Sequence, residues 1–334
     1  MFFYWQKDMK VYPTKIVLAN IAIKIFKKTK EVTVRKIVFY PETTLQDLDA
    51  GTVVMYPIKK RNLYYVVPSF LIIGAQKCGT RELHTWLSMH PNLRTSEREL
   101  HFFNEVIDIE KEWIRYVIQP HFMHSRGKKH FNKHCFYTFE KSPAYFNDLN
   151  YQTPTAEVVQ QMMPSAKLVL LLRNPTDRAY SAYHMGKKST RFRDASKSSR
   201  QDFTTLVKHK IKNLDNKPQE QLVRLGYYSL YLQRWLDVFP RENIFIIFLE
   251  HFKERPLVVM KDLLEFLELP PLDYAPLIEK NFRGLWVVKG EYSKGNRKPY
   301  KPMAEKAKAI LDEHYAPWNE KLKEMLPNCE IPWM

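Results

Sequence analysis

The stretch 69–87, SFLIIGAQKCGTRELHTWL, places a lysine inside a turn bounded by glycines. An apolar run at 70–73 leads into Gly74, and Gly79 precedes residues with helical spacing. A turn of this kind between a buried strand and a helix aims backbone N–H groups and the positive helix end at an anion. Lys77 lies two residues before Gly79, whereas the nucleoside triphosphatase loop carries its lysine directly after the second glycine. The pattern therefore predicts a short phosphate ligand bound without a metal.

A second anion site is predicted in the segment LLLRNPTDRAYSAY. Arg173 directly follows an apolar run, and Ser181 lies eight residues further on, in the helix expected there. Ligands of open α/β sheets bind at the carboxyl ends of the strands, and an arginine fork is well suited to phosphate. A salt bridge at the strand end is the alternative interpretation of Arg173. One site for a 5′-phosphate derivative and one for a 3′-phosphate together describe 3′-phosphoadenosine 5′-phosphosulfate (PAPS), a sulfuryl donor.

A mostly parallel sheet is required to bring these two segments together. Continuous apolar runs predict buried strands at 70–73, 168–172 and 244–249, as expected where helices cover both faces of a sheet. Amphipathic segments alternate with these runs, which is typical of βα units. They predict helices over 80–89, 176–185, 229–238, 257–267 and 303–325. We therefore expect an α/β fold, a single P-loop-like domain with a central, mostly parallel sheet and helices on both faces.

The 334 residues are predicted to form a basic N-terminal extension, 1–60, and one domain, 61–334. Short β-like runs occur in the extension at 36–40 and 52–56, and the polar stretch 186–203 predicts a long exposed loop. The longest apolar stretch near the N-terminus, 16–23, is too short for a spanning helix, which needs about 20 residues. No signal-peptide pattern accompanies it. We therefore expect a soluble protein with no encoded export route.

Charge and cysteine content narrow the classes of partner. Lysine and arginine number 53 against 36 aspartates and glutamates, which gives a net charge of +17. A positive field of this size suggests a polyanion, and nucleic acid, anionic lipid or acidic polysaccharide would each satisfy it. A basic surface without a function is the alternative. Cys78, Cys135 and Cys329 lack metal-ligand spacing and cannot build a disulfide framework, so no metal is expected.

Four motifs in order carry a family resemblance. FLIIGAQKCGTREL, RELHFF, FEKSPAYF and LLLRNPTDRAYSAY follow one another as in the sulfotransferases that modify heparan sulfate. The chain looks most like the glucosaminyl 3-O-sulfotransferase branch over about 68–326. The N-sulfotransferase branch is a near second. In that branch we would expect Gly-Thr-Thr, with Thr in place of Arg81, and Gln in place of His101. The resemblance implies PAPS-dependent transfer of a sulfuryl group to a glucosamine unit of heparan sulfate, at the 3-O position. N-sulfation, or action as another carbohydrate sulfotransferase, is the alternative.

The resemblance also implies catalytic roles. Glu99 matches the base that accepts the proton of the acceptor hydroxyl, and His101 would orient Glu99 or bind the acceptor. Lys77 would stabilise the bridging oxygen as the sulfuryl group departs, and Lys141 would be a second cation near that group. The competing interpretations are a solvated carboxylate for Glu99, a structural histidine, and a surface lysine paired with Glu140. Phe102 and Phe103 are expected in the core.

Donor and acceptor contacts are expected from three segments. The loop that resembles the family's late Lys-Gly-Arg segment carries Asn296 as an apparent insertion, and no cysteine precedes it from 282 to 293. Asn104 stands where the relatives usually carry aspartate. Arg81 and Lys289 are candidate polysaccharide contacts. The residues expected to bind PAPS are Lys77, Cys78, Gly79, Thr80, Arg81, Arg173, Ser181, Lys294, Gly295, Arg297 and Lys298.

The implied partner is an acidic polysaccharide of the heparan sulfate type, and the implied compartment is the Golgi lumen. Nucleic acid is not expected as a partner, because the sequence carries no zinc-finger, RRM or helix-turn-helix signature. A catalytically silent protein that binds heparin-like polyanions is the alternative from another class. The altered late loop favours this alternative, whereas the presence of Glu99, Lys77 and Arg173 favours an enzyme.

Overall fold

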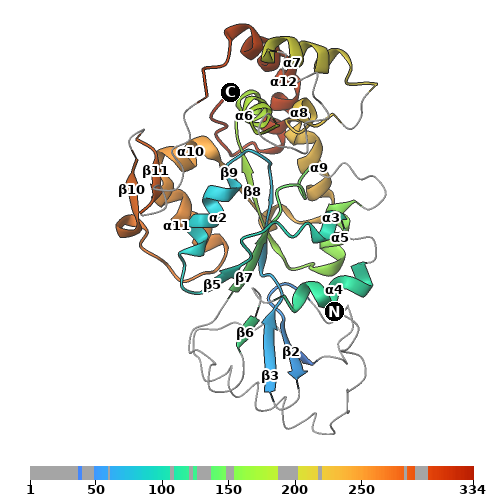
Figure 1. The fold of residues 1–334 in the computed structure, drawn as a ribbon, viewed down its shortest axis with the longest axis vertical. Coiled ribbons are helices and arrows are strands. Elements are labelled where there is room, and N and C mark those ends of the chain that lie inside the picture. Colours follow the sequence, from blue (N-terminus) through green and yellow to red (C-terminus); the bar gives the residue numbers. More distant parts are fainter. Residues whose placement is uncertain are drawn as a thin grey trace.

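A computed structural model describes residues 37–39, 49–58, 61–105, 109–119, 123–125, 137–147, 154–186, 202–216, 220–281, 284–289 and 300–334. At its centre lies a five-stranded sheet of order β5-β7-β4-β8-β9, in which every neighbouring pair is parallel (Figure 1). In sheet order the strands are β5 (Leu93–Thr95), β7 (Tyr137–Lys141), β4 (Phe70–Gly74), β8 (Lys167–Leu172) and β9 (Ile244–Phe248). The expected α/β architecture is confirmed.

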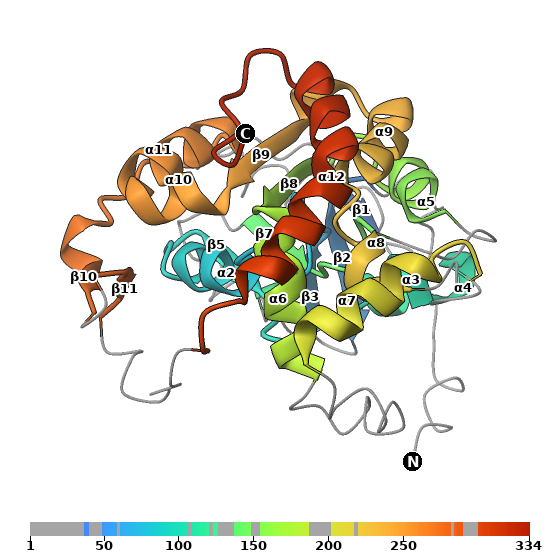
Figure 2. The ribbon, with the colours of Figure 1, turned by 90° about the horizontal axis from the view of Figure 1, so that it is seen from above.

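Helices cover both faces of this sheet, which explains why β4 and β8 are almost entirely apolar and buried. On one face lie α2 (Thr80–Ser88), α10 (Leu249–Glu254) and α11 (Pro256–Phe266), and on the other lie α5 (Thr155–Met162) and α9 (Tyr228–Val238) (Figures 1 and 2). Large aromatic side chains fill the layer between the helices: Trp86 of α2, for example, packs edge-on against Phe252 of α10, with ring centroids 5.3 Å apart.

The remaining helices are mostly amphipathic and lie around these layers. The long helix α12 packs against α9, α7 and α6. The bounds are α3 (Phe102–Glu105), α4 (Ile109–Val117), α6 (Pro175–Gly186), α7 (Phe203–Lys212), α8 (Gln221–Arg224), α12 (Glu305–Met325), and the 3-10 helices η6 (Arg241–Asn243) and η7 (Ala275–Leu277). Every predicted helix and strand is confirmed, with ends displaced by at most two residues.

Two smaller sheets complete the described structure. One has the order β1-β2-β3-β6, formed by β1 (Ile37–Phe39), β2 (Val53–Ile58), β3 (Arg61–Val66) and β6 (Met123–Ser125). The other pairs β10 (Ile278–Lys280) with β11 (Trp286–Val288). Because β2 and β3 pair with each other on either side of residue 60, the sheet joins the predicted extension to the predicted domain, and that division stays a prediction. The loop predicted at 186–203 lies outside the described residues except at its two ends.

Backbone hydrogen bonds join the carboxyl ends of the central strands. Ala75, just past β4, donates its backbone N–H to the carbonyl of Leu171 in β8 at 2.8 Å. Phe146, beyond β7, donates to the carbonyl of Ile73 at the same distance. The turn after β4, the segment after β7 and the end of β8 therefore meet at one edge of the sheet, where ligands of such folds bind.

Candidate functional site

The turn between β4 and α2 has the geometry of an anion site. Gly79, the N-cap of α2, lies in the left-handed region at φ 93°, and Lys77 lies there at φ 70°. A Cβ atom on Gly79 would also meet Leu249 Cδ1 at 2.6 Å, so the tip of that α10 side chain would have to move. No side chain caps α2 at Gly79. Within the first turn the N–H of Glu82 donates to the Gly79 carbonyl at 2.9 Å, so the N–H groups of Thr80 and Arg81 are the ones placed to receive a ligand, as in phosphate sites at helix N-termini.

Arg173 lies beside this turn, at the end of the neighbouring strand. Leu171, which accepts the Ala75 N–H, precedes Arg173 by two residues. At roughly 3.3–3.6 Å per residue, the Arg173 backbone therefore lies within about 10 Å of the start of the turn. The guanidinium also forms the strand-end ion pair of the alternative interpretation, with Nη2 3.6 Å from Asp177 Oδ2. Arg173 is half-buried and Asp177 is more exposed, and this contact leaves other donors of the guanidinium for an anion.

The start of α6 is held rigidly behind Arg173. Asn174 caps the helix, since its Oδ1 accepts the Thr176 N–H at 2.9 Å. The Asn174 N–H in turn donates to Glu250 Oε1 of α10 at 3.1 Å. Ser181 is half-buried two turns further along α6. The second predicted anion site thus has a fixed backbone.

Cys78, which the sequence groups with the donor contacts, faces inward. Its Sγ lies 3.4 Å from Tyr228 Oη beneath the turn. Burial raises the pKa of the Cys78 thiol to about 11, against smaller opposing effects of Tyr228 and of the nearby arginine charges. Cys78 can therefore serve a ligand only through its backbone N–H, which itself donates to the Ala75 carbonyl at 3.1 Å.

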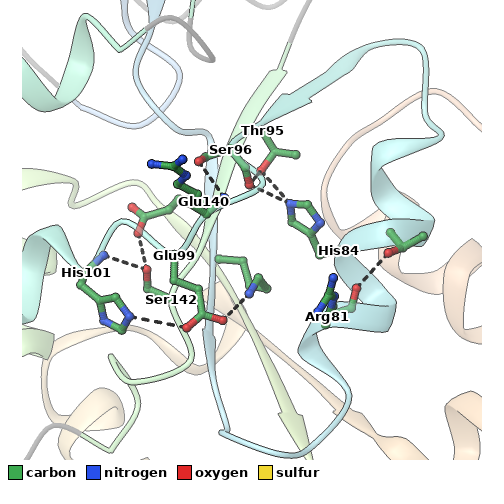
Figure 3. Close-up of polar contacts among 11 residues, drawn as sticks. Arg81, His84, Thr95, Ser96, Glu99, His101, Glu140 and Ser142 are labelled. Atoms are coloured by element: carbon green, nitrogen blue, oxygen red, sulfur yellow. Dashed lines mark hydrogen bonds and ion pairs between the residues drawn. The ribbon is translucent and has the colours of Figure 1, made fainter. Parts of the chain in front are cut away.

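Glu99, His101 and Lys141 come together beside the end of β7 (Figure 3). Lys141 Nζ donates to Glu99 Oε1, and His101 Nε2 lies 3.5 Å from Glu99 Oε2. The Lys141 side chain is only 6% exposed, whereas that of Glu99 is 41% exposed. The interpretation of Lys141 as a surface lysine paired with Glu140 is therefore wrong: successive side chains of a strand point to opposite faces, and Lys141 pairs with Glu99.

The two cations determine the charge of Glu99. Partial burial alone would raise its pKa, but hydrogen bonds from His101 and Lys141, together with their charges, outweigh burial and lower the pKa to about 2. The same hydrogen bond to Glu99 raises the pKa of His101, with smaller contributions from the charges of Glu105 and Glu99. At neutral pH the carboxylate is therefore ionised and positioned, but weakly basic while both partners hold it.

His101 itself has an unusual backbone, with φ at 54°. Its N–H donates to Ser142 Oγ at 3.1 Å, and its Nδ1 lies 3.7 Å from Glu105 Oε1. Phe102 and Phe103, which follow it, are buried as predicted.

Two groups at this edge were not predicted as site residues. Glu140, considered only as a partner for Lys141, is fully buried and accepts hydrogen bonds from Tyr116, Ser142 and Tyr145. The period of two along β7 separates Glu140 from Lys141 and could have revealed this. Lys253 of α10 is the other: burial, and then the charge of Arg173, lower the pKa of this lysine. No sequence signal distinguishes it from the other lysines.

The remaining predicted contacts are spread more widely. Arg81 is exposed on the first turn of α2, and Lys289 Nζ donates to the Pro276 carbonyl at 2.7 Å near the β10–β11 pair. Lys294, Gly295, Arg297 and Lys298 lie outside the described residues. Within the described ranges, no cluster of His, Cys, Asp or Glu is arranged to hold a metal ion. No helix in those ranges is long and apolar enough to cross a bilayer.

Comparison with known proteins agrees with this geometry. The family described as "Sulfotransferase domain" matches residues 68–323. Heparan sulfate glucosamine 3-O-sulfotransferase 5 of Homo sapiens is 29% identical over 231 residues, which span 68% of this chain and 61% of that protein. The bifunctional heparan sulfate N-deacetylase/N-sulfotransferase 2 of Homo sapiens is 28% identical over 296 residues, 80% of this chain and 30% of that protein. The chain thus spans less than two thirds of the length of either relative.

Among solved structures, the sulfotransferase from Alicyclobacillus acidocaldarius has the same fold. It superposes with a TM-score of 0.55 at 23% identity, covering 79% of this chain and 97% of that one. The matched region 68–323 begins at β4 and contains the turn, Glu99, Lys141 and Arg173. The chain therefore belongs to the sulfotransferase family, as the four sequence motifs predict.

Proposed function

We propose that this protein transfers the sulfuryl group of PAPS to a glucosamine unit of a heparan-sulfate-type glycosaminoglycan. The observation that carries the proposal is the Glu99 carboxylate held between Lys141 and His101. It lies at the sheet edge that also carries a turn suited to phosphate and Arg173. The similarity to heparan sulfate 3-O- and N-sulfotransferases supports the acceptor class.

The donor would be bound at two points. The first-turn N–H groups of α2, with Thr80 and Arg81, receive the 5′-phosphosulfate, and Lys77 neutralises the charge that develops on the bridging oxygen. Arg173 and Ser181 receive the 3′-phosphate. Lys294, Gly295, Arg297 and Lys298 are proposed to complete the donor site by the family resemblance.

Transfer requires a base on the acceptor side. Glu99 takes the proton of the sugar hydroxyl as the new O–S bond forms and the S–O bond to the donor phosphate breaks. Lys141, which donates to Glu99, would turn toward the sulfuryl oxygens of a bound donor. Loss of that pairing raises the basicity of Glu99 at the moment when a base is needed, and places a cation on the transferring group.

The acceptor is proposed to lie against the positive surface. The net charge of +17 favours a polyanion. Arg81, on the first turn of α2, and Lys289, next to the β10–β11 pair, are exposed cations. Among glucosamine positions we propose 3-O, because the residues Gly-Thr-Arg and Glu-x-His-Phe-Phe resemble that branch. The Golgi lumen is the proposed compartment, again by family resemblance.

Transfer of labelled sulfate from PAPS to defined oligosaccharides tests the proposal. The acceptors should carry glucosamine as the free amine, the N-acetyl form or the N-sulfo form, with the products analysed as disaccharides. Label at the 3-O position of an N-sulfated acceptor supports the proposal, whereas label on the free amine selects N-sulfation. Glu99→Gln keeps the shape but loses the base, and should lower the rate about 10²–10⁴-fold while heparin is retained.

One result would favour the alternative from another class. If the parent protein binds heparin tightly but transfers no sulfate to any glycosaminoglycan, it is a catalytically silent polyanion-binding protein. Binding of 3′-phosphoadenosine 5′-phosphate, the donor product, that persists at high salt separates that case from a simple basic surface, because salt screens contacts with exposed surface charge.

A further inference from the structure

A buried carboxylate lies behind the Glu99 cluster. Glu140, the fourth residue of β7, has no exposed surface. Its Oε1 accepts hydrogen bonds from Ser142 Oγ and Tyr145 Oη, both at 2.6 Å, and its Oε2 accepts one from Tyr116 Oη at 2.5 Å. Removing a carboxylate from water is costly, and an apolar side chain of similar volume is often as stable. Burial raises the pKa of Glu140, against the opposing hydrogen bonds from Ser142, Tyr116 and Tyr145. An ionisable side chain retained at such a site therefore calls for a role.

The contacts of Ser142 suggest that role. A serine hydroxyl has one proton to donate and lone pairs to accept. Its proton is committed to Glu140, so a lone pair is directed at the N–H of His101, 3.1 Å away. His101 has a left-handed backbone, which a residue with a Cβ adopts only where its surroundings impose it. The Glu140–Ser142 pair supplies one such constraint.

The segment 99–101 passes around the end of β7. Lys141 binds the side chain of Glu99, and Ser142, which donates to Glu140, accepts the backbone N–H of His101 (Figure 3). The imidazole then reaches back to Glu99 Oε2 at 3.5 Å. A second link runs in parallel, because the N–H of Phe103 donates to Tyr145 Oη at 3.4 Å and Tyr145 is itself bound to Glu140. Glu140 thus anchors the backbone of residues 101–103 through Ser142 and Tyr145.

We propose that Glu140 is a positioning residue for sulfuryl transfer, acting through Ser142 to hold the His101 imidazole against Glu99. It does not touch substrate. The inference rests on the proposed function for the reaction that it serves, but the placement of His101 can be measured without that reaction.

The titration of His101, followed by NMR of histidine-labelled protein, is the readout that is independent of activity. The charged groups that face the imidazole are Glu99 and Glu105, with Lys141 and Glu140 further off. Contact with Glu99 raises the pKa of His101. If the anchor is lost, the imidazole leaves Glu99 and the pKa falls back toward its ordinary value.

Four variants test the anchor. Ser142→Ala removes one hydroxyl, and Glu140→Gln keeps the shape of the side chain but removes its charge. Ser142→Thr restores a hydroxyl at the same position. Ser229→Ala is the matched control, because Ser229 is also a buried serine with one hydrogen bond, to the Trp318 carbonyl at 3.0 Å, away from this edge.

We expect Ser142→Ala and Glu140→Gln to lower the His101 pKa and to reduce kcat about tenfold or more, with affinity for the donor product unchanged. Ser142→Thr and Ser229→Ala should titrate and turn over like the parent. The proposal is overturned if folded Ser142→Ala keeps the parent titration curve and kcat, or if Ser142→Thr is as impaired as Ser142→Ala. If Glu140→Gln does not fold, the results for Ser142→Ala alone decide whether the proposal holds. If the parent transfers no sulfate, the proposed function fails while the His101 titration still tests the anchor.

Discussion

Glu99 lies between two cations, and this position gives the carboxylate a measurable dependence on pH. Its pKa is lowered to about 2 from an ordinary value of 4.5, chiefly because the bonds from His101 and Lys141 outweigh burial. A group with a lowered pKa in the folded state stabilises that state fully above its unfolded pKa. That stabilisation is lost as the pH falls through the folded pKa. Because the side chain is 41% exposed, solvent screening keeps the effect modest.

Unfolding of the parent and of Glu99→Gln in urea should show this dependence. The parent's advantage in free energy of unfolding should be constant above about pH 5 and shrink between pH 4.5 and 2. Urea midpoints measured at several pH values across this window give the result. An advantage that stays constant down to pH 2 would mean that Lys141 and His101 do not hold Glu99 in solution.

Arg173 is proposed to bind the donor at the same edge of the sheet. Arg173→Ala should weaken binding of the donor product by about 1.5–3 kcal/mol, the usual contribution of a hydrogen bond to a charged group. Titration calorimetry measures this loss. Arg241→Ala is the control, because Arg241 lies just before β9, at the opposite edge of the sheet. Equal affinities of the Arg173 and Arg241 variants would exclude Arg173 from the donor site.

At the scale of residues, the sequence predicts which residues lie together better than it predicts which of them form pairs. Glu99, His101 and Lys141 were each identified through motifs and do lie together. The pairing of Lys141 with Glu99 joins residues 42 positions apart, and no local pattern encodes a contact at that separation. The partners of Glu140 likewise follow from no local pattern: Lys141 is next to it in sequence, but Glu140 binds Tyr116, Ser142 and Tyr145 instead.

At the scale of elements, the turn from β4 into α2 has the strictest steric demands. Gly79 combines a left-handed φ of 93° with the close approach of Leu249 from α10. Gly74, at the end of β4, is equally crowded, since a Cβ there would meet Phe146 Cβ at 2.4 Å. The turn is therefore fixed by packing against segments that follow much later in the chain.

Gly79→Ala should lower both stability and donor-product affinity. The left-handed conformation alone costs about 1–2 kcal/mol for a residue with a Cβ, and the contact of 2.6 Å adds to that cost. Gly186→Ala is the matched control, because Gly186 ends α6 with nothing within 4 Å of an added Cβ. Urea unfolding and calorimetry compare the two variants. If Gly79→Ala bound the donor product as tightly as the parent does, the turn would not be part of the donor site.

The predicted central strands and helices share one physical property, a clear apolar pattern. β4, β8 and β9 are largely continuous apolar runs, and α2, α6, α9, α11 and α12 have helical spacing. β7 was not predicted, because it carries Thr138, Glu140 and Lys141, polar side chains buried by pairing with distant partners. β5, β6, β10 and β11 have three residues each, too few to display any period.

At the scale of the whole molecule, charge and topology act together. The parallel order of the central sheet collects the turn, Arg173 and the Glu99 cluster at one edge, while a net charge of +17 attracts polyanions to the surface as a whole. Under the proposed function, donor recognition would depend on local hydrogen bonds, and attraction of the polysaccharide would depend on long-range charge. These two kinds of interaction respond differently to salt.

Affinity for a heparin-type oligosaccharide should fall about tenfold or more as sodium chloride rises from about 0.05 to about 0.3 M, because screening and released counterions weaken exposed charge contacts. Donor-product affinity, which rests on half-buried groups, should fall much less over the same range. Calorimetry of both ligands in one buffer series provides the comparison. If the affinities for the oligosaccharide and for the donor product fell equally steeply with salt, the donor product would be bound by general surface charge.

The inward thiol of Cys78 has a practical consequence for labelling the protein. With a pKa of about 11, only roughly one Cys78 in ten thousand is a thiolate at neutral pH, and the thiolate is the form that reacts. Maleimide or iodoacetamide should therefore react very slowly with Cys78. Of the two cysteines in the described part of the chain, the reagent should modify Cys329, which is half-buried beyond the end of α12. A fluorophore attached there would leave the turn after β4 chemically untouched.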